Sequence, residues 1–223
     1  MRRKLLLLGG FFLLLLAVFY VLLFAGTNYY KVSLPVLSYV KDFRFTDQNG
    51  KPVSERNVDG KVYVAEYFFT TCKGICPKMN ANMKGIYDKF KKEDRFAIVS
   101  HTCMPETDSV CKLKMHEQKL LGIEDHSPNN NWYFVTGNKN DLYKMARESY
   151  LLDDEKNNNV NIDDQFIHTQ FFALVDKQRR VRGIYDGLRQ DELNKLSADI
   201  KELLKETPDA RRGLISPFSN NPN

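Results

Sequence analysis

The hydrophobic residues of this chain predict strands alternating with helices. Short apolar runs typical of buried strands alternate with segments in which apolar residues recur at three- and four-residue spacing, as on one face of a helix. The predicted strands are Val62–Phe69, Arg95–Ser100, Trp132–Thr136, Gln170–Val175 and Arg180–Tyr185. The predicted helices run from about Met79 to Phe90, Glu106 to Leu121, Asp141 to Tyr150 and Leu193 to Leu204. A hairpin with an Asn-Gly turn is expected at residues 43–53.

This order of elements predicts an α/β fold in which a central mixed sheet is flanked by helices, as in thioredoxin-like proteins. The domain is expected to occupy residues 41–207, and the Asn- and Asp-rich residues 153–164 should form an exposed loop within it. Residues 28–40 are predicted to be a spacer before the domain. The Pro-, Asn- and Ser-rich residues 208–223 are predicted to be a disordered tail.

Residues 1–27 are predicted to form an N-terminal transmembrane anchor. The apolar run from Leu5 to about Ala25 is uninterrupted, and roughly 20 apolar residues span a hydrocarbon core of about 30 Å. A cleavable signal peptide would have an apolar region of only about 7–15 residues. The three basic residues at positions 2–4 are expected to keep the N-terminus in the cytoplasm. The domain would then lie on the periplasmic, extracytoplasmic side of a bacterial cytoplasmic (inner) membrane.

Composition and charge add two constraints. The 223 residues are 43% hydrophobic, which allows one domain with its own core beside the extra segments. Part of the net charge of +5 flanks the anchor and part lies in the tail, so nothing indicates a nucleic-acid partner. Export would permit disulfides among the four cysteines, with three pairings that the sequence does not distinguish.

The candidate chemistry begins with the motif Cys72-Lys73-Gly74-Ile75-Cys76-Pro77, directly after the first strong strand. Proline belongs in the first turn of a helix, so a helix should begin near Pro77. The positive end of that helix should favour the thiolate form of a cysteine placed there. The three-residue gap leaves room for an ion between the sulfurs. It also keeps them close enough to form a disulfide, so Cys72 and Cys76 are a candidate redox-active pair.

A single histidine, His168, completes this constellation late in the chain. In thioredoxin-like folds the segment that enters this late strand passes over the cysteine loop, so His168 should face the sulfurs. Thiolates suit Cu(I) and imidazole keeps Cu(II) acceptable, so two sulfurs and one nitrogen favour copper. The simpler alternatives are an inert Cys72–Cys76 disulfide and a partly buried polar side chain at His168.

With these residues the sequence resembles the Sco/SenC family of membrane-anchored copper-binding proteins. The resemblance runs from about residue 43 to residue 204. It rests on Thr70–Pro77, on Asp164–His168 followed by Phe171–Asp176, and on the N-terminal anchor.

The resemblance implies that copper, as Cu(I) or Cu(II), is bound by Cys72, Cys76 and His168. It further implies a metallochaperone that delivers copper or electrons during assembly of the binuclear copper centre of a haem-copper oxidase. The expected partner is the copper-centre subunit of that oxidase or a similar copper enzyme. The alternative is a thiol–disulfide oxidoreductase that keeps the partner's copper-site cysteines reduced, with Cys72 as the attacking thiol. That mechanism does not need His168 as a ligand. A peroxidase is disfavoured because no activating arginine is evident around Cys72.

The stretch Ser100–Asp108 departs from the family, whose members commonly have an Asp-Pro pair here. Cys103 and Cys111 are not part of the family's metal set. A second, structural disulfide between them is predicted, and two small buried residues are the alternative. His101, Cys103 and Met104 also form a cluster of soft donors, which leaves a secondary copper contact open.

The remaining histidines and methionines are given structural roles. His116 and His126 are expected at solvated helix or loop positions. Met79, Met83 and Met115 are expected to pack their helices rather than bind copper.

Overall fold

The computed structural model describes residues 2–24, 34–122, 131–153, 161–162, 167 and 169–206. The chain divides into two compact units, Met1–Leu34 and Pro35–Asn223. The first unit contains helix α1 (Arg2–Phe24). Across the described residues, no helix combines the length and the apolarity needed to cross a membrane. Membrane anchoring stays a prediction.

The described part of the second unit is built on one sheet of eight strands. The strands are β1 (Ser38–Tyr39), β2 (Arg44–Asp47), β3 (Pro52–Ser54), β4 (Val62–Phe68), β5 (Phe96–Thr102), β6 (Trp132–Thr136), β7 (Phe171–Val175) and β8 (Arg180–Asp186). The helices are α2 (Glu55–Val58), α3 (Cys76–Phe90), α4 (Val110–Leu121), α5 (Lys139–Lys144), the π-helix η1 (Met145–Tyr150) and α6 (Gln190–Lys205).

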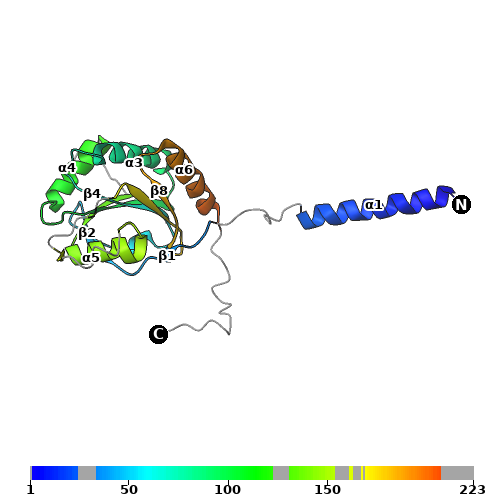
Figure 1. Ribbon diagram of the computed structural model, residues 1–223, viewed down its shortest axis with the longest axis horizontal. Helices are drawn as coiled ribbons and strands as arrows, with labels where there is room; N and C mark the ends of the chain where they lie inside the picture. The colour runs from blue at the N-terminus through cyan, green and yellow to red at the C-terminus, as the bar shows by residue number, and fades with distance from the viewer. Residues whose placement is uncertain are drawn as a thin grey trace, which may run out of the picture. The chain divides into compact units, whose positions relative to one another are not determined.

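The strand order is β1-β8-β7-β4-β5-β6-β2-β3. β4, β5 and β6 run parallel, and the other neighbouring pairs are antiparallel. Parallel neighbours need crossover connections, and α3 and α4 lie in those that follow β4 and β5. Figure 1 shows α3, α4 and α6 together along one face of the sheet and α5 on the opposite face. The prediction of a central mixed sheet flanked by helices is confirmed.

The two central strands are fully enclosed. All seven residues of β4 and all seven of β5 are buried, as expected of strands covered on both faces. Side chains of a strand alternate between the faces. Tyr63 and Tyr67 belong to the core cluster that includes residues of α5 and η1. Glu66 therefore points to the other face, which α3 and α4 cover.

The predicted hairpin is confirmed as β2 and β3. The Asp47 carboxylate Oδ1 accepts hydrogen bonds from the backbone N–H groups of Asn49 and Lys51, both at 2.8 Å. Gly50 has a φ of 74°, which glycine adopts without steric cost. The Asn-Gly pair therefore forms the turn.

Several boundaries differ from those predicted. α4 begins at Val110 rather than near Glu106 because the preceding loop is held by Asp108. The third predicted helix is regular only as far as Lys144 and continues as the π-helix η1. The last part of the predicted spacer contributes strand β1, which pairs with β8 at the edge of the sheet. The predicted loop at residues 153–164 lies almost entirely outside the described residues, and the tail at 208–223 lies wholly outside them.

The two ends of the described domain meet at one arginine. Arg182 is 2% exposed and lies on β8. Its guanidinium donates to Asp176 Oδ2 (2.8 Å), to Glu206 Oε2 (3.2 Å) and to the backbone carbonyl of Pro35 (3.2 Å). The chain just before β1 and the chain just after α6 are thus fastened to the same side chain.

Candidate metal and thiol site

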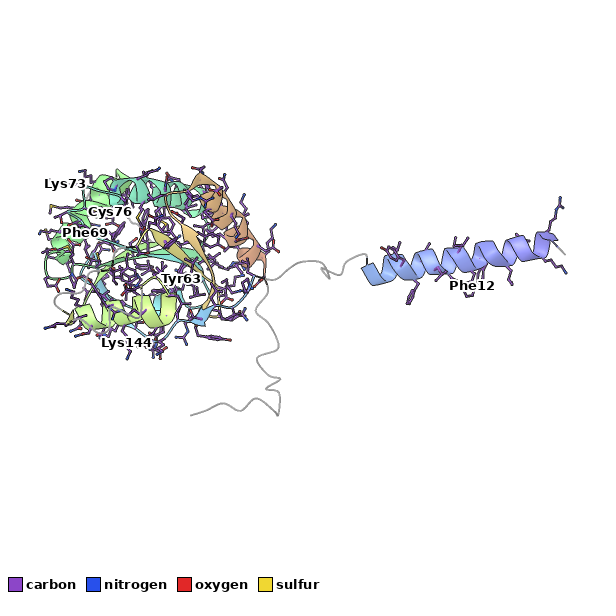
Figure 2. All side chains as sticks on the ribbon, in the orientation of Figure 1. Phe12, Tyr63, Phe69, Lys73, Cys76 and Lys144 are labelled. Atoms are coloured by element: carbon purple, nitrogen blue, oxygen red, sulfur yellow. The ribbon has the colours of Figure 1, made fainter. Side chains whose placement is uncertain are left out.

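The cysteine motif lies where β4 gives way to α3, as the sequence predicts. Cys76 is the first residue of α3 and Pro77 follows in the first turn. Cys72 is partly exposed and Cys76 is buried, and both are free thiols. The two side chains lie within hydrogen-bonding reach of each other. Figure 2 shows Phe69, Lys73 and Cys76 near one another at one end of the domain.

Burial controls the protonation of the second cysteine. Burial, with smaller contributions from the neighbouring Cys72, raises the pKa of Cys76 to about 12. A hydrogen bond from the backbone of Phe69 opposes this shift. Burial therefore opposes the thiolate form that was expected for a cysteine at the start of a helix. A metal ion or an exchange partner must displace the proton of this thiol.

A buried carboxylate holds the loop that carries Cys72. Asp108 is fully buried. It accepts hydrogen bonds from Thr70 N (3.1 Å), Thr70 Oγ1 (2.6 Å) and Thr102 Oγ1 (2.5 Å). The loop after β4 is thus tied to the loop after β5. Sequence reasoning missed this role because an aspartate before a helix reads as an ordinary turn residue.

A second buried carboxyl lies beneath the start of α3. Glu66 Oε1 accepts from Ser100 Oγ (2.6 Å), which in turn accepts from Trp132 Nε1 (2.8 Å). Glu66 Oε2 has no hydrogen-bond partner among the described residues. Burial raises the pKa of Glu66 to about 8, and its negative charge raises the pKa of Cys76. The signal in the sequence was a carboxylate inside an otherwise apolar strand.

Comparison with known proteins identifies the family. The SCO1/SenC family model matches residues 34–205. The chain belongs to the SCO1/SenC family. It is 31% identical to the SCO1 protein homolog of Bacillus subtilis (strain 168) over 169 residues, which cover 75% of this chain and 83% of that protein.

Solved structures of Sco proteins share the fold. BsSco, a member of the Sco family of cytochrome c oxidase assembly proteins in which a disulfide switch was identified, is 28% identical. The match has a TM-score of 0.63 and covers 78% of this chain and 99% of that chain. Bradyrhizobium japonicum ScoI, solved with copper bound, is similar in fold, with 19% identity, a TM-score of 0.56 and coverage of 74% and 99%. The thioredoxin-like, Sco-type fold is confirmed.

The second pair of cysteines in this SCO1/SenC chain does not form the predicted disulfide. All four cysteines are free thiols, with Cys103 buried and Cys111 exposed. Cys103 belongs to the core cluster on the side of the sheet that carries α5, whereas Cys111 lies in the first turn of α4. Burial raises the pKa of Cys103 far above its usual range, with smaller contributions from Cys76 and Asp108.

His101 is a core residue. Its ring stacks on Tyr67 at 4.9 Å between centroids and meets the edges of Tyr150 (5.2 Å) and Phe45 (5.6 Å). Burial lowers its pKa to about 4, so it is neutral at physiological pH. Its Nε2 atom has no hydrogen-bond partner among the described residues. The predicted soft-donor cluster gains no support, because alternation along β5 directs His101 away from the face under α3.

His116 is not the solvated residue that was expected. It is half-buried, stacks on Phe68 at 5.0 Å, and its Nε2 lies 3.2 Å from Asn80 Nδ2. Met79 and Met83 are buried as predicted, but Met115 is 55% exposed, so the packing role predicted for it is wrong. His126 lies outside the described residues.

His168 also lies outside the described residues. Its neighbour Ile167 is buried in the core cluster with Cys103. The Tyr143 hydroxyl donates to the carbonyl of Cys103 (2.9 Å) and accepts a hydrogen bond from the backbone of Ile167. Among the residues that the structure describes, no three His, Cys, Asp or Glu side chains form a group that could hold a metal ion.

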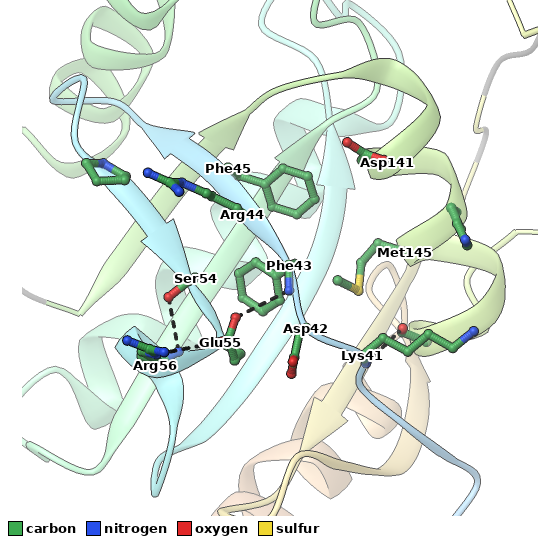
Figure 3. A pocket seen from close by; sticks show the side chains of 13 residues that line it. Lys41, Asp42, Phe43, Arg44, Phe45, Ser54, Glu55, Arg56, Asp141 and Met145 are labelled. Atoms are coloured by element: carbon green, nitrogen blue, oxygen red, sulfur yellow. Dashed lines mark hydrogen bonds and ion pairs between the residues drawn. The ribbon is translucent and has the colours of Figure 1, made fainter. Parts of the chain in front are cut away.

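Two cavities of the domain are large enough to be candidate sites. The larger, of about 810 Å³, lies beside β2, β3 and α5 and is lined by residues such as Phe43, Glu55 and Met145 (Figure 3). It contains no cysteine or histidine. The smaller, of about 660 Å³, lies between α3 and α4 and is lined in part by both Cys72 and Cys76. The smaller cavity is therefore the candidate metal and thiol site, because its lining includes the two cysteine sulfurs.

Proposed function

We propose that this chain is a membrane-anchored copper metallochaperone. It binds one copper ion through Cys72, Cys76 and His168 and delivers it, or prepares the site, during assembly of the binuclear copper centre of a haem-copper oxidase. The observation that carries the proposal is the pair of free thiols, within hydrogen-bonding reach of each other, at the junction of β4 and α3 in a SCO1/SenC chain. Thiolate sulfur is the donor that Cu(I) prefers.

The described residues around the pair support this role in two ways. Asp108 fixes the loop that carries Cys72, so the sulfur positions are preorganised for a small ion. Tyr143 ties Ile167 to the carbonyl of Cys103, and the backbone N–H of Cys103 donates to the carbonyl of Phe68 (2.9 Å) at the end of β4, just before the cysteine loop. The chain next to residue 168 is therefore held close to the cysteine loop, as an imidazole ligand at that position requires.

Membrane attachment is part of the proposal. It is supported by the apolar run that begins at Leu5, by the basic residues at positions 2–4 and by the division of the chain into two units after Leu34. The proposed orientation places the domain on the extracytoplasmic side of a bacterial inner membrane, where copper enzymes of the respiratory chain are assembled.

A second function, thiol–disulfide reduction, is favoured by the unequal exposure of the pair. Cys72 is partly exposed and Cys76 is buried. In this reaction the Cys72 thiolate attacks a disulfide of the partner, forming a mixed disulfide and releasing one partner thiolate, which takes up a proton. Cys76 loses its proton and attacks Cys72 Sγ, which releases the second partner thiol and leaves a Cys72–Cys76 disulfide. A dithiol reductant must then restore the pair.

Metal titration of cysteine and histidine variants separates the two functions. Cys72→Ser and Cys76→Ser are expected to abolish tight Cu(I) and Cu(II) binding, because a neutral hydroxyl cannot replace a thiolate. His168→Ala is expected to weaken Cu(II) binding severely and Cu(I) binding less, because Cu(II) prefers nitrogen-rich surroundings. Cys111→Ser is the matched control, since it removes an exposed thiol outside the site.

The measurements are competition with a chromophoric Cu(I) chelator and the thiolate-to-copper charge-transfer absorption of the Cu(II) form. Wild type and Cys111→Ser should show that absorption, and the other three variants should lose or shift it. Unchanged Cu(II) binding and unchanged assembly of the oxidase copper site in His168→Ala would reject the metallochaperone mechanism in favour of the reductase.

A further inference from the structure

The cavity between α3 and α4, here called the α3–α4 groove, opens beside the cysteine pair. Its volume of about 660 Å³ lies within the range of about 300–1,000 Å³ found for sites that enclose a ligand. Cys72 and Cys76 line it together with Pro77 and Ala81 of α3 and Met115 and Leu120 of α4. Two sulfurs and an imidazole around one copper ion do not require a hollow of this size.

The apolar part of the groove is presented to solvent. Met115 lies on its wall and is 55% exposed, although methionine is a residue that proteins usually bury. Methionine is also common at surfaces that adapt to a bound peptide, because its side chain is flexible and polarisable. The wall opposite contains Pro77 and Ala81, which are short and leave room for an incoming side chain.

The groove is preformed. Asn80 Nδ2 lies 3.2 Å from His116 Nε2, which links α3 to α4. The His116 ring stacks on Phe68 at the end of β4, with centroids 5.0 Å apart. Burial lowers the pKa of His116, so the ring is neutral and accepts this hydrogen bond at physiological pH. A site whose walls are already held in place loses less entropy when a partner binds.

The rim of the groove is strongly basic. Residues 69–90 and 110–121, which form the motif loop, α3 and α4, contain seven lysines and two acidic residues. The excess of five positive charges in these two segments is as large as the net charge of the whole chain, which is +5. Lys112 and Lys119 are exposed and line the groove, and no ion pair joins either to another described residue. Lys84, also on the rim, pairs with Asp88 at 2.6 Å.

We infer that the α3–α4 groove is the docking site for an acidic, apolar peptide segment of the protein that receives copper. Apolar side chains of the segment would cover Met115, and its carboxylates would pair with Lys112 and Lys119. Seven residues along a helix span about 10 Å, so the two carboxylates should lie about that far apart. This inference rests on the proposed function for the identity of the partner. It adds how that partner is recognised and why it approaches Cys72 and Cys76.

A synthetic peptide tests the groove without any assumption about the natural partner. The probe is acetyl-Asp-Leu-Ala-Leu-Asp-amide, whose carboxylates reach about 10–13 Å apart in an extended chain. The comparison peptide is acetyl-Lys-Leu-Ala-Leu-Lys-amide. NMR of methyl-labelled methionine in the full-length protein, solubilised in detergent, should show the Met115 signal shifting with the acidic peptide alone. Equal shifts with both peptides, or none with the acidic one, would overturn the inference.

Charge-reversal variants test the same surface with a protein partner. Lys112→Glu/Lys119→Glu should weaken binding of the oxidase copper domain by about tenfold or more and reduce its salt dependence. The matched control is Lys92→Glu/Lys201→Glu, which makes the same charge change at exposed positions outside the groove. Both double variants should bind Cu(I) as wild type does, because neither touches a sulfur.

The two arms separate failure of docking from failure of the proposed function. If wild type transfers copper and Lys112→Glu/Lys119→Glu transfers it at the same rate, docking in the groove is refuted while the metallochaperone role stands. Absence of transfer by wild type would refute that role, and the peptide experiment would still decide whether the groove binds acidic segments.

Discussion

Removal of the Asp108 carboxylate is expected to damage both the stability of the domain and the cysteine loop. Asp108→Ala deletes an acceptor that binds three donors at 2.5–3.1 Å, two on Thr70 and one on Thr102. Thr102 is fully buried, so its hydroxyl cannot turn to water. The backbone N–H of Thr70 would also lose its partner at the start of the loop that leads to Cys72.

The size of the effect follows from those three bonds. A hydrogen bond to a charged group contributes about 1.5–3 kcal/mol, and a buried group left unpaired costs about 1–3 kcal/mol. Part of the lost free energy is recovered because Thr70 is only half-buried, so water can bond to its unpaired groups. We expect Asp108→Ala to lower the free energy of unfolding by about 3–5 kcal/mol. Asp108→Asn should cost only about 1–2 kcal/mol, because one amide oxygen still accepts two bonds and a threonine hydroxyl can accept from the amide nitrogen.

Urea unfolding of both variants, together with Cu(I) competition, measures these effects. Glu106→Ala is the matched control, since it removes an exposed carboxylate of the same loop whose bridge to Lys139 is 3.6 Å long. It should change stability by less than about 1 kcal/mol. An Asp108→Ala protein within about 1 kcal/mol of wild type, or an Asn variant as damaged as the Ala variant, would refute the argument from the three bonds.

Three further outcomes are expected. The pKa of Glu66 is about 8 in the folded state, against an ordinary value of 4.5. Between these two pH values only the folded state holds the proton. The free energy of unfolding should therefore fall by roughly 2–5 kcal/mol as the pH rises from about 4.5 to about 8. Glu66→Gln should flatten that slope in urea midpoints taken at pH 5 and pH 8, and an unchanged slope would disprove the assignment. Cys111 should react quickly with a thiol reagent in the folded protein and Cys103 only on unfolding, because one is exposed and the other buried; equal rates by mass spectrometry would contradict this. In cells stripped of their outer envelope, added protease should digest the domain, and its protection would reject the proposed orientation.

Much of the fold could be predicted because its elements are long and strongly patterned. β4 and β6 were located to within one residue because each is a compact apolar run between polar segments. The start of α4 was placed too early because Asp108, whose partners are Thr70 after β4 and Thr102 at the end of β5, holds the preceding loop. The π-helix η1 was missed because its apolar spacing over six residues does not differ from that of a regular helix.

The two cysteines of the candidate site were predictable, and the residues around them were less so. Cys72 and Cys76 could be found because their spacing and the proline are local features. The roles of Glu66 and Asp108 depend on which residues lie side by side across β4 and β5, and periodicity alone does not provide that register. Met115 was assigned to packing because it shares a helical pattern with buried neighbours, and a rotation of one residue decides which side chain faces solvent.

The position of Arg182 shows at which end of the domain a tether would be joined. Arg182 lies on β8 near the end of the sheet where β4 begins, since Val175 pairs with both Tyr63 and Val181. The cysteine motif follows the opposite end of β4. Both points at which the chain enters and leaves the domain are therefore on the far side from the sulfurs, about 15–20 Å away along the strands. A tether joined to the domain at either of these points would therefore leave the end that carries Cys72 and Cys76 accessible to another protein.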